Sequence, residues 1–341
     1  MSVPRTTDVV IIGGGFAGLS TAHMLAARGI QAHVLEREPE IGLYASGRSA
    51  GLGRQLAEDD ATTRLTVRGA ELLRTELARA WQPTGGILSF DDAALALTYA
   101  DRAARLGVAT VALDHAGVLA RWPMLTDLPM AAALFVPSDG TIDVKVLLGV
   151  FAEGIAIHRA TGVERVDATD GGALVRTSTG DTIAARVVVD AAGAWAGAAT
   201  SDPPLASFKR HVFVLQATPI ADAPFLWHLG ARELYVRPDG DATLASPCDA
   251  ARIEPTDQQP DLVGESHLRA VLELAAPELA DSAIAKRWAC HRAFADDRQM
   301  RLGRDATRPW LVWAAALGGH GATAAPAVGE RVAAAVIEAL A

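Results

Sequence analysis

Residues 13–18 form a glycine-rich turn whose spacing suits phosphate binding. They read Gly-Gly-Gly-Phe-Ala-Gly and follow residues 8–12, a short β-branched run typical of a buried parallel strand. Gly13 allows a tight turn, Gly15 lets a pyrophosphate approach the backbone, and Gly18 lets the following helix pack closely on the strand. The turn therefore predicts a dinucleotide site. An α/β unit without a ligand is the alternative.

The elements after this turn come in the order that such a site needs. We expect a helix over residues 17–28, with its N–H groups and positive dipole end directed at the phosphates. A strand over residues 30–35 then ends at Glu36. This carboxylate is placed to accept hydrogen bonds from both hydroxyls of an adenosine ribose, and it disfavours a 2′-phosphate.

Two further strand-to-turn units lie far along the chain. Residues 187–195 read as a buried strand that runs into a turn of small residues, after a hairpin centred on residues 179–181. Near the end, residues 310–316 predict a strand, residues 318–321 a glycine turn, and residues 323–339 a helix. We infer that distant parts of the chain converge on one long cofactor.

The composition limits the class of protein. With 341 residues, 50% of them hydrophobic and 21% charged, the chain predicts a folded protein of two domains. A net charge of −9 without a Lys/Arg cluster argues against nucleic acid as a partner. The two cysteines suit a reducing compartment, and the histidines lack metal-ligand spacing, so no metal is expected.

The apolar runs are too short to cross a membrane. The segment before residue 8 has no room for a secretory signal, and residues 310–317 are the longest later apolar run. We therefore expect a cytoplasmic protein.

Together these motifs resemble the D-amino-acid oxidase superfamily of FAD-dependent oxidoreductases, and within it D-arginine dehydrogenase and glycine oxidase. The resemblance covers nearly the whole chain in the same order, through residues 8–37, 46–50, 138–143, 191–195, 234–240, 288–294 and 318–321. It implies an α/β fold with a Rossmann-like FAD-binding domain and an interleaved substrate domain built on a mixed or antiparallel sheet. In this numbering the FAD domain would comprise 1–80, 141–202 and 305–341, and the substrate domain 81–140 and 203–304.

The resemblance also implies which residues hold the cofactor. FAD is expected to contact Gly13, Gly15, Phe16, Ala17, Gly18, Glu36, Arg37, Ser46, Arg48, Ser49, Ala50, Val163, Ala192, Gly193, Trp195, Gly318 and Gly321. Cys290 matches the position at which monomeric sarcosine oxidase links a cysteine to its flavin. A small buried hydrophobic side chain is the alternative for this residue, and we expect non-covalent FAD.

The implied reaction is oxidative deamination of a small amino acid, of the D-amino-acid oxidase or dehydrogenase type, by hydride transfer from the α-carbon to flavin N5. By resemblance, Arg292 binds the substrate carboxylate bidentately and Tyr235 donates a second hydrogen bond to it. The turn containing Gly319 and His320 would place backbone N–H groups and a helix dipole near the negative charge of the reduced flavin.

Three positions bear on the choice of substrate side chain. The glutamate that pairs with the guanidinium in D-arginine dehydrogenase is replaced by Gly86, so a cationic substrate is not expected. Arg54, if it turns inward, would favour an acidic or otherwise polar substrate. His211 is a third candidate for this pocket. We expect neutral or acidic substrates to be preferred over cationic ones.

Other functions remain compatible with the sequence. Oxidation of a secondary amine or N-substituted glycine uses the same carboxylate clamp. A flavin-binding protein without turnover and an NAD-dependent dehydrogenase are more distant alternatives. Oxygen or a quinone is expected to reoxidise the flavin.

Overall fold

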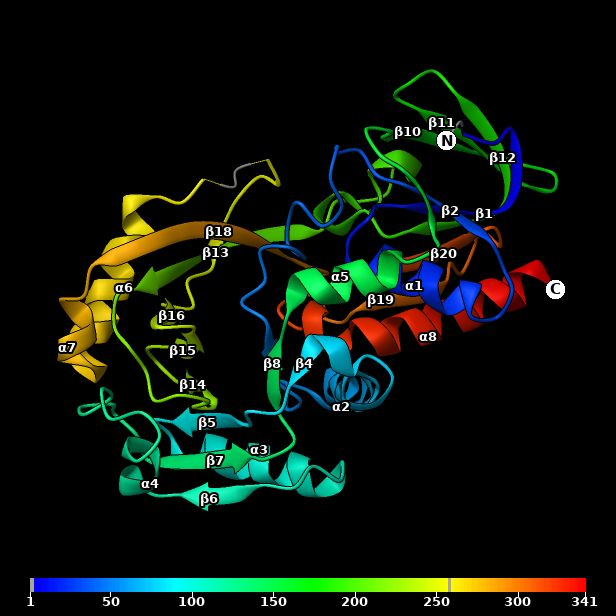
Figure 1. Ribbon diagram of the computed structural model, residues 1–341. Helices are drawn as coiled ribbons and strands as arrows, with labels where there is room; N and C mark the ends of the chain where they lie inside the picture. Colours follow the sequence, from blue (N-terminus) through cyan, green and yellow to red (C-terminus); the bar gives the residue numbers. More distant parts are fainter. Residues whose placement is uncertain (1–2, 257–258) are drawn as a thin grey trace.

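The fold is built on two large sheets, and two long strands of the second sheet extend toward the first (Figure 1). The computed structural model describes residues 3–256 and 259–341. The first sheet has eight strands in the order β10-β11-β12-β1-β2-β9, with β20 also paired to β12 and β19 paired to β20. Its strands are β1 (Thr6–Ile12), β2 (Ala32–Leu35), β9 (Ala156–His158), β10 (Val163–Thr169), β11 (Gly172–Thr177), β12 (Thr182–Asp190), β19 (Arg301–Arg304) and β20 (Leu311–Ala315).

The parallel centre of this sheet is made from segments far apart in sequence. Strand β1 lies between β2 and β12, and β20 runs parallel to β12. Because β-branched residues fill the second parts of β1 and β12, residues 9–12 and 187–190 are buried on both faces of the sheet. Helices α1 (Phe16–Ala26), α5 (Val144–Ala152) and α8 (Gly321–Leu340) pack with them in one apolar core.

The second sheet has nine strands in the order β17-β13-β16-β15-β14-β5-β7-β6, with β18 paired to β13. They are β5 (Gly86–Phe90), β6 (Val111–Leu113), β7 (Ala132–Val136), β13 (Ala206–Leu215), β14 (Phe225–Leu229), β15 (Leu234–Asp239), β16 (Ala242–Ser246), β17 (Ala251–Arg252) and β18 (Ile284–Phe294). Most pairs are antiparallel, but β14 and β5 run parallel, so the sheet is mixed.

Strands β13 and β18 form a long antiparallel ribbon that reaches from the second sheet toward the first (Figure 1). In its register Arg210 faces Cys290 and Phe208 faces Arg292. Since alternate residues of a strand share a face, Arg210, Cys290 and Arg292 lie on the same face of the ribbon. The ribbon thus carries these side chains to the first sheet.

Short elements complete the fold. Helices α6 (Leu262–Ala275) and α7 (Pro277–Ala280) cover one part of the second sheet, and α3 (Ala93–Arg105) and α4 (His115–Leu119) lie beside β5 to β7 (Figure 1). A small sheet joins β3 (Leu52–Gly53), β8 (Gly140–Ile142) and β4 (Trp81–Gln82), next to α2 (Asp60–Thr75). Three 3₁₀ turns lie at Ala78–Ala80, Gly193–Trp195 and Ala198–Thr200.

The sequence-based fold class is confirmed, with small shifts in the element ends. The helix expected over residues 17–28 is α1, the strand expected over 30–35 is β2, and the last helix begins at Gly321, two residues earlier than expected. The proposed domain limits stay a prediction. Within the described part of the chain, every helix is too short or too polar to traverse a bilayer.

Candidate functional site

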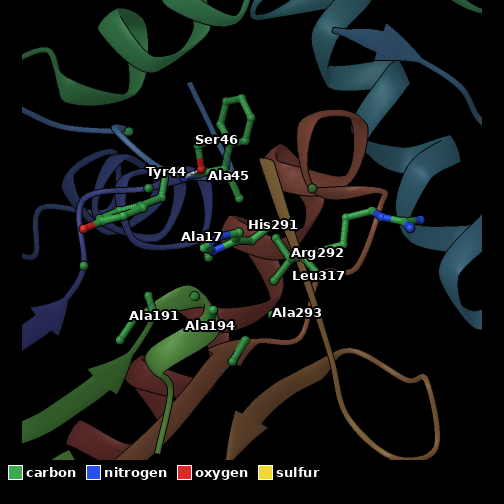
Figure 2. A pocket seen from close by; sticks show the side chains of 18 of the residues that line it. Ala17, Tyr44, Ala45, Ser46, Ala191, Ala194, His291, Arg292, Ala293 and Leu317 are labelled. Atoms are coloured by element: carbon green, nitrogen blue, oxygen red, sulfur yellow. Dashed lines mark hydrogen bonds between the residues drawn. The ribbon is translucent and has the colours of Figure 1, made fainter. Parts of the chain in front are cut away.

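A cavity lies where the first sheet, the β13–β18 ribbon and the start of α8 meet (Figure 2). Figure 2 shows that its labelled wall residues come from the beginning, the middle and the end of the chain: Ala17, Tyr44, Ala45, Ser46, Ala191, Ala194, His291, Arg292, Ala293 and Leu317. The predicted site residues that line it are Gly13, Gly15, Phe16, Ala17, Glu36, Arg37, Ser46, Ser49, Ala50, Arg54, Val163, Ala192, Gly193, Trp195, Tyr235, Arg292, Gly318, Gly319, His320 and Gly321. The structure thus places most of the predicted site residues around one cavity.

The glycine turn is packed so closely that side chains would not fit. Gly13 has a φ of +102°, and a Cβ there would lie 2.5 Å from the carbonyl oxygen of Ala191. A Cβ on Gly18 would lie 2.0 Å from the carbonyl oxygen of Gly13. Gly18 itself does not line the cavity, because it supports the turn from behind. Its part in cofactor binding is therefore indirect.

Two helix N-termini open at the cavity, and both fit the expected FAD. Helix α1 is preceded by Gly15 and α8 by His320, and neither residue caps its helix with a side chain. The first turn of each helix also lacks an acidic residue. Since the positive dipole ends remain uncompensated, α1 suits a pyrophosphate and α8 suits a negatively charged flavin ring.

The Glu36 carboxylate is fixed by hydrogen bonds from backbone N–H groups, one of them in the glycine turn. Its Oε2 accepts a hydrogen bond of 2.7 Å from the Gly14 N–H, and its Oε1 accepts one of 2.9 Å from the Glu38 N–H. The side chain is 8% exposed and lines the cavity. This fixed carboxylate agrees with the predicted contact to the adenosine ribose.

Arg37 and Trp195, both predicted from the sequence, are joined beside Glu36 by Tyr44 and His291, which the sequence reasoning missed. The Arg37 guanidinium carbon lies 4.2 Å from the centre of the Trp195 ring, and its Nη2 donates to the Tyr44 hydroxyl at 2.9 Å. The rings of Tyr44 and Trp195 are 4.7 Å apart, and His291 lies beside both. The only signal in the sequence was an aromatic residue within the polar segment after Glu36.

Arg48 lies outside the cavity wall and ties the loop to β18 instead. Its Nη1 donates to the carbonyl oxygen of Ala289 at 3.0 Å, and its Nε donates to that of Leu43 at 3.1 Å. In return the Trp288 indole donates to the Arg48 carbonyl at 2.9 Å. Its side chain therefore positions the loop that carries Ser46.

Arg292 is a partly buried cation in the wall of the cavity. Its Nη2 donates to the carbonyl oxygen of Asp249 at 3.1 Å, while its Nε has no partner among the described residues. Burial and the neighbouring Arg210 lower the pKa of Arg292 to about 10. It still carries its proton at neutral pH. Tyr235, 4% exposed on β15, lines the same cavity, and burial raises its pKa, so its hydroxyl remains a donor.

The structure corrects two candidates for the substrate pocket. His211 is outside the cavity, because its Nδ1 is paired with Asp249 Oδ2 at 2.7 Å and its Nε2 accepts from the Asp261 N–H at 3.1 Å. Gly86 is also outside it, since it is packed against Phe225, where a Cβ would lie 2.3 Å from a ring carbon. Neither residue can select a substrate side chain directly.

His211 contacts the cavity residues only through Asp249. It fixes Asp249, whose backbone carbonyl oxygen accepts hydrogen bonds from both Arg292 and Arg210. Arg210, like Trp227, lines the cavity and was missed by the sequence reasoning.

The Arg54 side chain points into the protein, as the hypothesis of an acidic or polar substrate requires. It is 3% exposed, and its guanidinium carbon lies 4.0 Å from the centre of the Trp227 ring. Its Nη2 is paired with Glu58 Oε1 at 2.7 Å, and Glu58 Oε2 is 2.7 Å from the Nε2 of His320. The Nε and Nη1 of Arg54 lack partners within the described chain.

A protein-family model for FAD-dependent oxidoreductases, DAO, matches residues 8–335. The chain belongs to the DAO family of FAD-dependent oxidoreductases. This membership confirms the predicted family, cofactor and enzyme class. Whether the flavin is covalently held stays a prediction.

Curated relatives match only part of their own length. One subunit of the anaerobic glycerol-3-phosphate dehydrogenase of Escherichia coli (strain K12) is 32% identical over 209 residues, which cover 56% of this chain and 38% of that protein. The mitochondrial sarcosine dehydrogenase of Mus musculus is 26% identical over 266 residues, covering 70% of this chain and 29% of that protein. The chain thus spans less than two fifths of the length of these relatives.

Solved structures match over nearly the whole chain. L-proline dehydrogenase from P. horikoshii has a TM-score of 0.88 and 25% identity, with 97% of this chain and 93% of that one covered. Glycine oxidase from Geobacillus kaustophilus has a TM-score of 0.87 and 21% identity, with 98% and 95% covered. Iminodiacetate oxidase from Chelativorans sp. BNC1 has a TM-score of 0.80 and 23% identity, with 97% and 95% covered. The fold is therefore shared with these flavoenzymes.

Proposed function

We propose that the protein oxidises the carbon–nitrogen bond of a small amino acid and leaves an imine. The observation that carries this proposal is the position of Arg292, a partly buried side chain with a buried, unpaired Nε in the same cavity wall as the dinucleotide turn. A planar guanidinium holds a carboxylate through two hydrogen bonds. Tyr235, protonated and buried in the same wall, adds a third donor.

The charges of the cavity favour the reactive form of the amine. Arg54, Arg210 and Arg292 all line the wall and all are mostly buried. Because like charges disfavour a protonated ammonium group, they lower the pKa of the bound amine. The substrate then presents a lone pair on nitrogen without a dedicated catalytic base.

When bound, FAD would supply the acceptor for the hydride, a proton together with its two electrons, that leaves the α-carbon. The chain's own contribution is to fix the substrate carboxylate through Arg292 and so orient the α-carbon. The uncapped start of α8, beside Gly319 and His320, directs its positive dipole end toward the charge that develops on reduction. Water then hydrolyses the iminium to a keto acid and ammonia, and oxygen or a quinone serves as the final acceptor.

Relatives support an amine substrate and favour a second candidate. They include a glycine oxidase, an L-proline dehydrogenase, an iminodiacetate oxidase and a sarcosine dehydrogenase. Proline, iminodiacetate and sarcosine are secondary amines, so oxidation of an N-substituted glycine is the second candidate. The resemblance seen in the sequence favours a D-amino acid.

The test is anaerobic mixing of the purified flavoprotein with a substrate panel. The panel contains D- and L-amino acids, glycine, sarcosine, L-proline, iminodiacetate and glycerol 3-phosphate. We expect at least one amino acid or amine to bleach the flavin absorbance. Bleaching by glycerol 3-phosphate alone would reject the proposal, and bound FAD that no compound bleaches would identify a flavin-binding protein without turnover.

A further inference from the structure

We propose that Arg54 forms a second anion subsite, so that the preferred substrate is an amino or imino dicarboxylate. This inference rests on the proposed function, in which Arg292 takes the α-carboxylate. The second acidic group of the substrate would then meet the guanidinium of Arg54, at a different place in the wall of the same cavity.

Arg54 is held in place but is not fully compensated. It is 3% exposed, and its guanidinium lies over the face of Trp227 at 4.0 Å. Its Nη2 reaches Glu58, whereas Nε and Nη1 have no partner in residues 3–256 and 259–341. A buried charge with unused donors is costly unless a ligand supplies acceptors. An anionic group in the cavity would supply them.

The position of Arg54 relative to Arg292 suits a short substrate with two acidic groups. Arg54 Nη2 lies 3.4 Å from the Nε2 of His320, and a Cβ on Gly319 would lie 3.7 Å from the Cδ of Arg292. Gly319 and His320 are consecutive, so the two arginine side chains approach neighbouring residues of one turn. A small molecule in this cavity can therefore meet both guanidinium groups.

The surrounding charges leave the cavity short of anions. Arg210 donates to the carbonyl oxygens of Cys248 and Asp249, which are uncharged acceptors, and the Asp249 carboxylate is engaged by His211. Glu58, Glu233 and Asp139 are carboxylates whose charges act on Arg54, and burial raises the pKa of Asp139 to about 7. The Glu58 carboxylate is shared between Arg54 and His320. A substrate dicarboxylate would balance the three arginines better.

Two other roles for Arg54 make different predictions. It could bind the same carboxylate as Arg292, in which case its loss would weaken substrates with one and with two carboxylates equally. It could also act only through its ion pair with Glu58 and its contact with Trp227, in which case its loss would weaken neither.

The binding test uses the intact flavoprotein and ligands that it cannot oxidise. Succinate and glutarate are titrated against propionate and butyrate, with the flavin spectrum as the readout. The wild type should bind the dicarboxylates at least tenfold more tightly than the monocarboxylates, and Arg54→Gln should remove this preference. A tenfold change corresponds to about 1.4 kcal/mol. Arg64→Gln, at an exposed arginine of α2, is the matched control and should keep the preference.

A second variant should act in the opposite direction. Glu58 is the side chain paired with Arg54 Nη2, so Glu58→Gln removes the negative charge that competes with a ligand for this guanidinium and should tighten succinate or glutarate binding severalfold. This variant retains Arg54, and it therefore decides the question even if Arg54→Gln does not fold. Unchanged or weaker dicarboxylate binding in Glu58→Gln would overturn the subsite.

Turnover separates failure of this inference from failure of the proposed function. We expect kcat/KM for iminodiacetate, D-aspartate or D-glutamate to exceed that for sarcosine or D-alanine, and Arg54→Gln to lower only the first group. If sarcosine or D-alanine bleaches the flavin and the acidic compounds do not, the inference fails and the proposed function stands. If no compound bleaches it, the proposed function fails, and the succinate titration still decides whether Arg54 binds an anion.

Discussion

Replacing Arg292 with lysine separates the geometry of the carboxylate clamp from its charge. Lysine keeps a positive charge but loses the planar pair of donors that holds a carboxylate bidentately. A hydrogen bond to a charged group contributes about 1.5–3 kcal/mol. Loss of one such bond should lower kcat/KM by a factor of roughly 10 to 150. Because the carboxylate is bound both before and during the reaction, most of the loss should appear as a higher KM.

The assay is steady-state oxidation of the best substrate from the panel, with FAD content measured for each variant. Arg287→Lys is the matched control, since Arg287 lies on the same strand, β18, but is exposed and paired with Glu265. The control should retain kcat/KM within a factor of about two. The reasoning is refuted if Arg292→Lys behaves like the control, or if its activity falls only in proportion to lost FAD.

Four further predictions concern the cofactor and stability. Gly18→Ala places a Cβ 2.0 Å from the Gly13 carbonyl oxygen and should yield protein with little FAD by absorbance, whereas Gly149→Ala, which meets nothing within 4 Å, should retain it. Burial raises the pKa of Asp139 from its ordinary 3.8 to about 7. The stability that its protonated form contributes is fully present below pH 3.8 and is lost as the pH rises through 7. Asp139→Asn should therefore reduce the fall in Tm over this pH range. Trp122→Ala removes a fully buried ring and should cost about 3–5 kcal/mol in urea unfolding while leaving FAD bound. Burial raises the pKa of Cys290 and disfavours its thiolate, so acid precipitation should leave all yellow colour in the supernatant; a yellow pellet would show a covalent flavin.

The sequence was most informative where the structure is local. The turn at residues 13–18, helix α1 and strand β2 follow one another without interruption, and their spacing alone predicts their pairing. The glycine at residue 18 was interpretable because its role, close packing against Gly13, needs no knowledge of distant segments.

The walls of the cavity were harder to predict, because they depend on pairing between remote strands. Arg210 enters the site through its register opposite Cys290 on β18, and Trp227 enters through β14. No local pattern marks either residue. His211 was a candidate for the substrate pocket, but its ring is paired with the Asp249 carboxylate and does not line the cavity. The sequence thus pointed to this residue but not to the contacts of its side chain.

The order in which the chain leaves the ribosome has a consequence for when the enzyme can acquire its cofactor. Strand β1 pairs with β12, β12 pairs with β20, and the wall of the cavity is completed only by the first turn of α8. A nascent chain that has reached residue 300 therefore has its phosphate turn but neither its last central strand nor the second helix terminus. The cavity proposed to hold FAD is complete only after residues 311–323 have been synthesised.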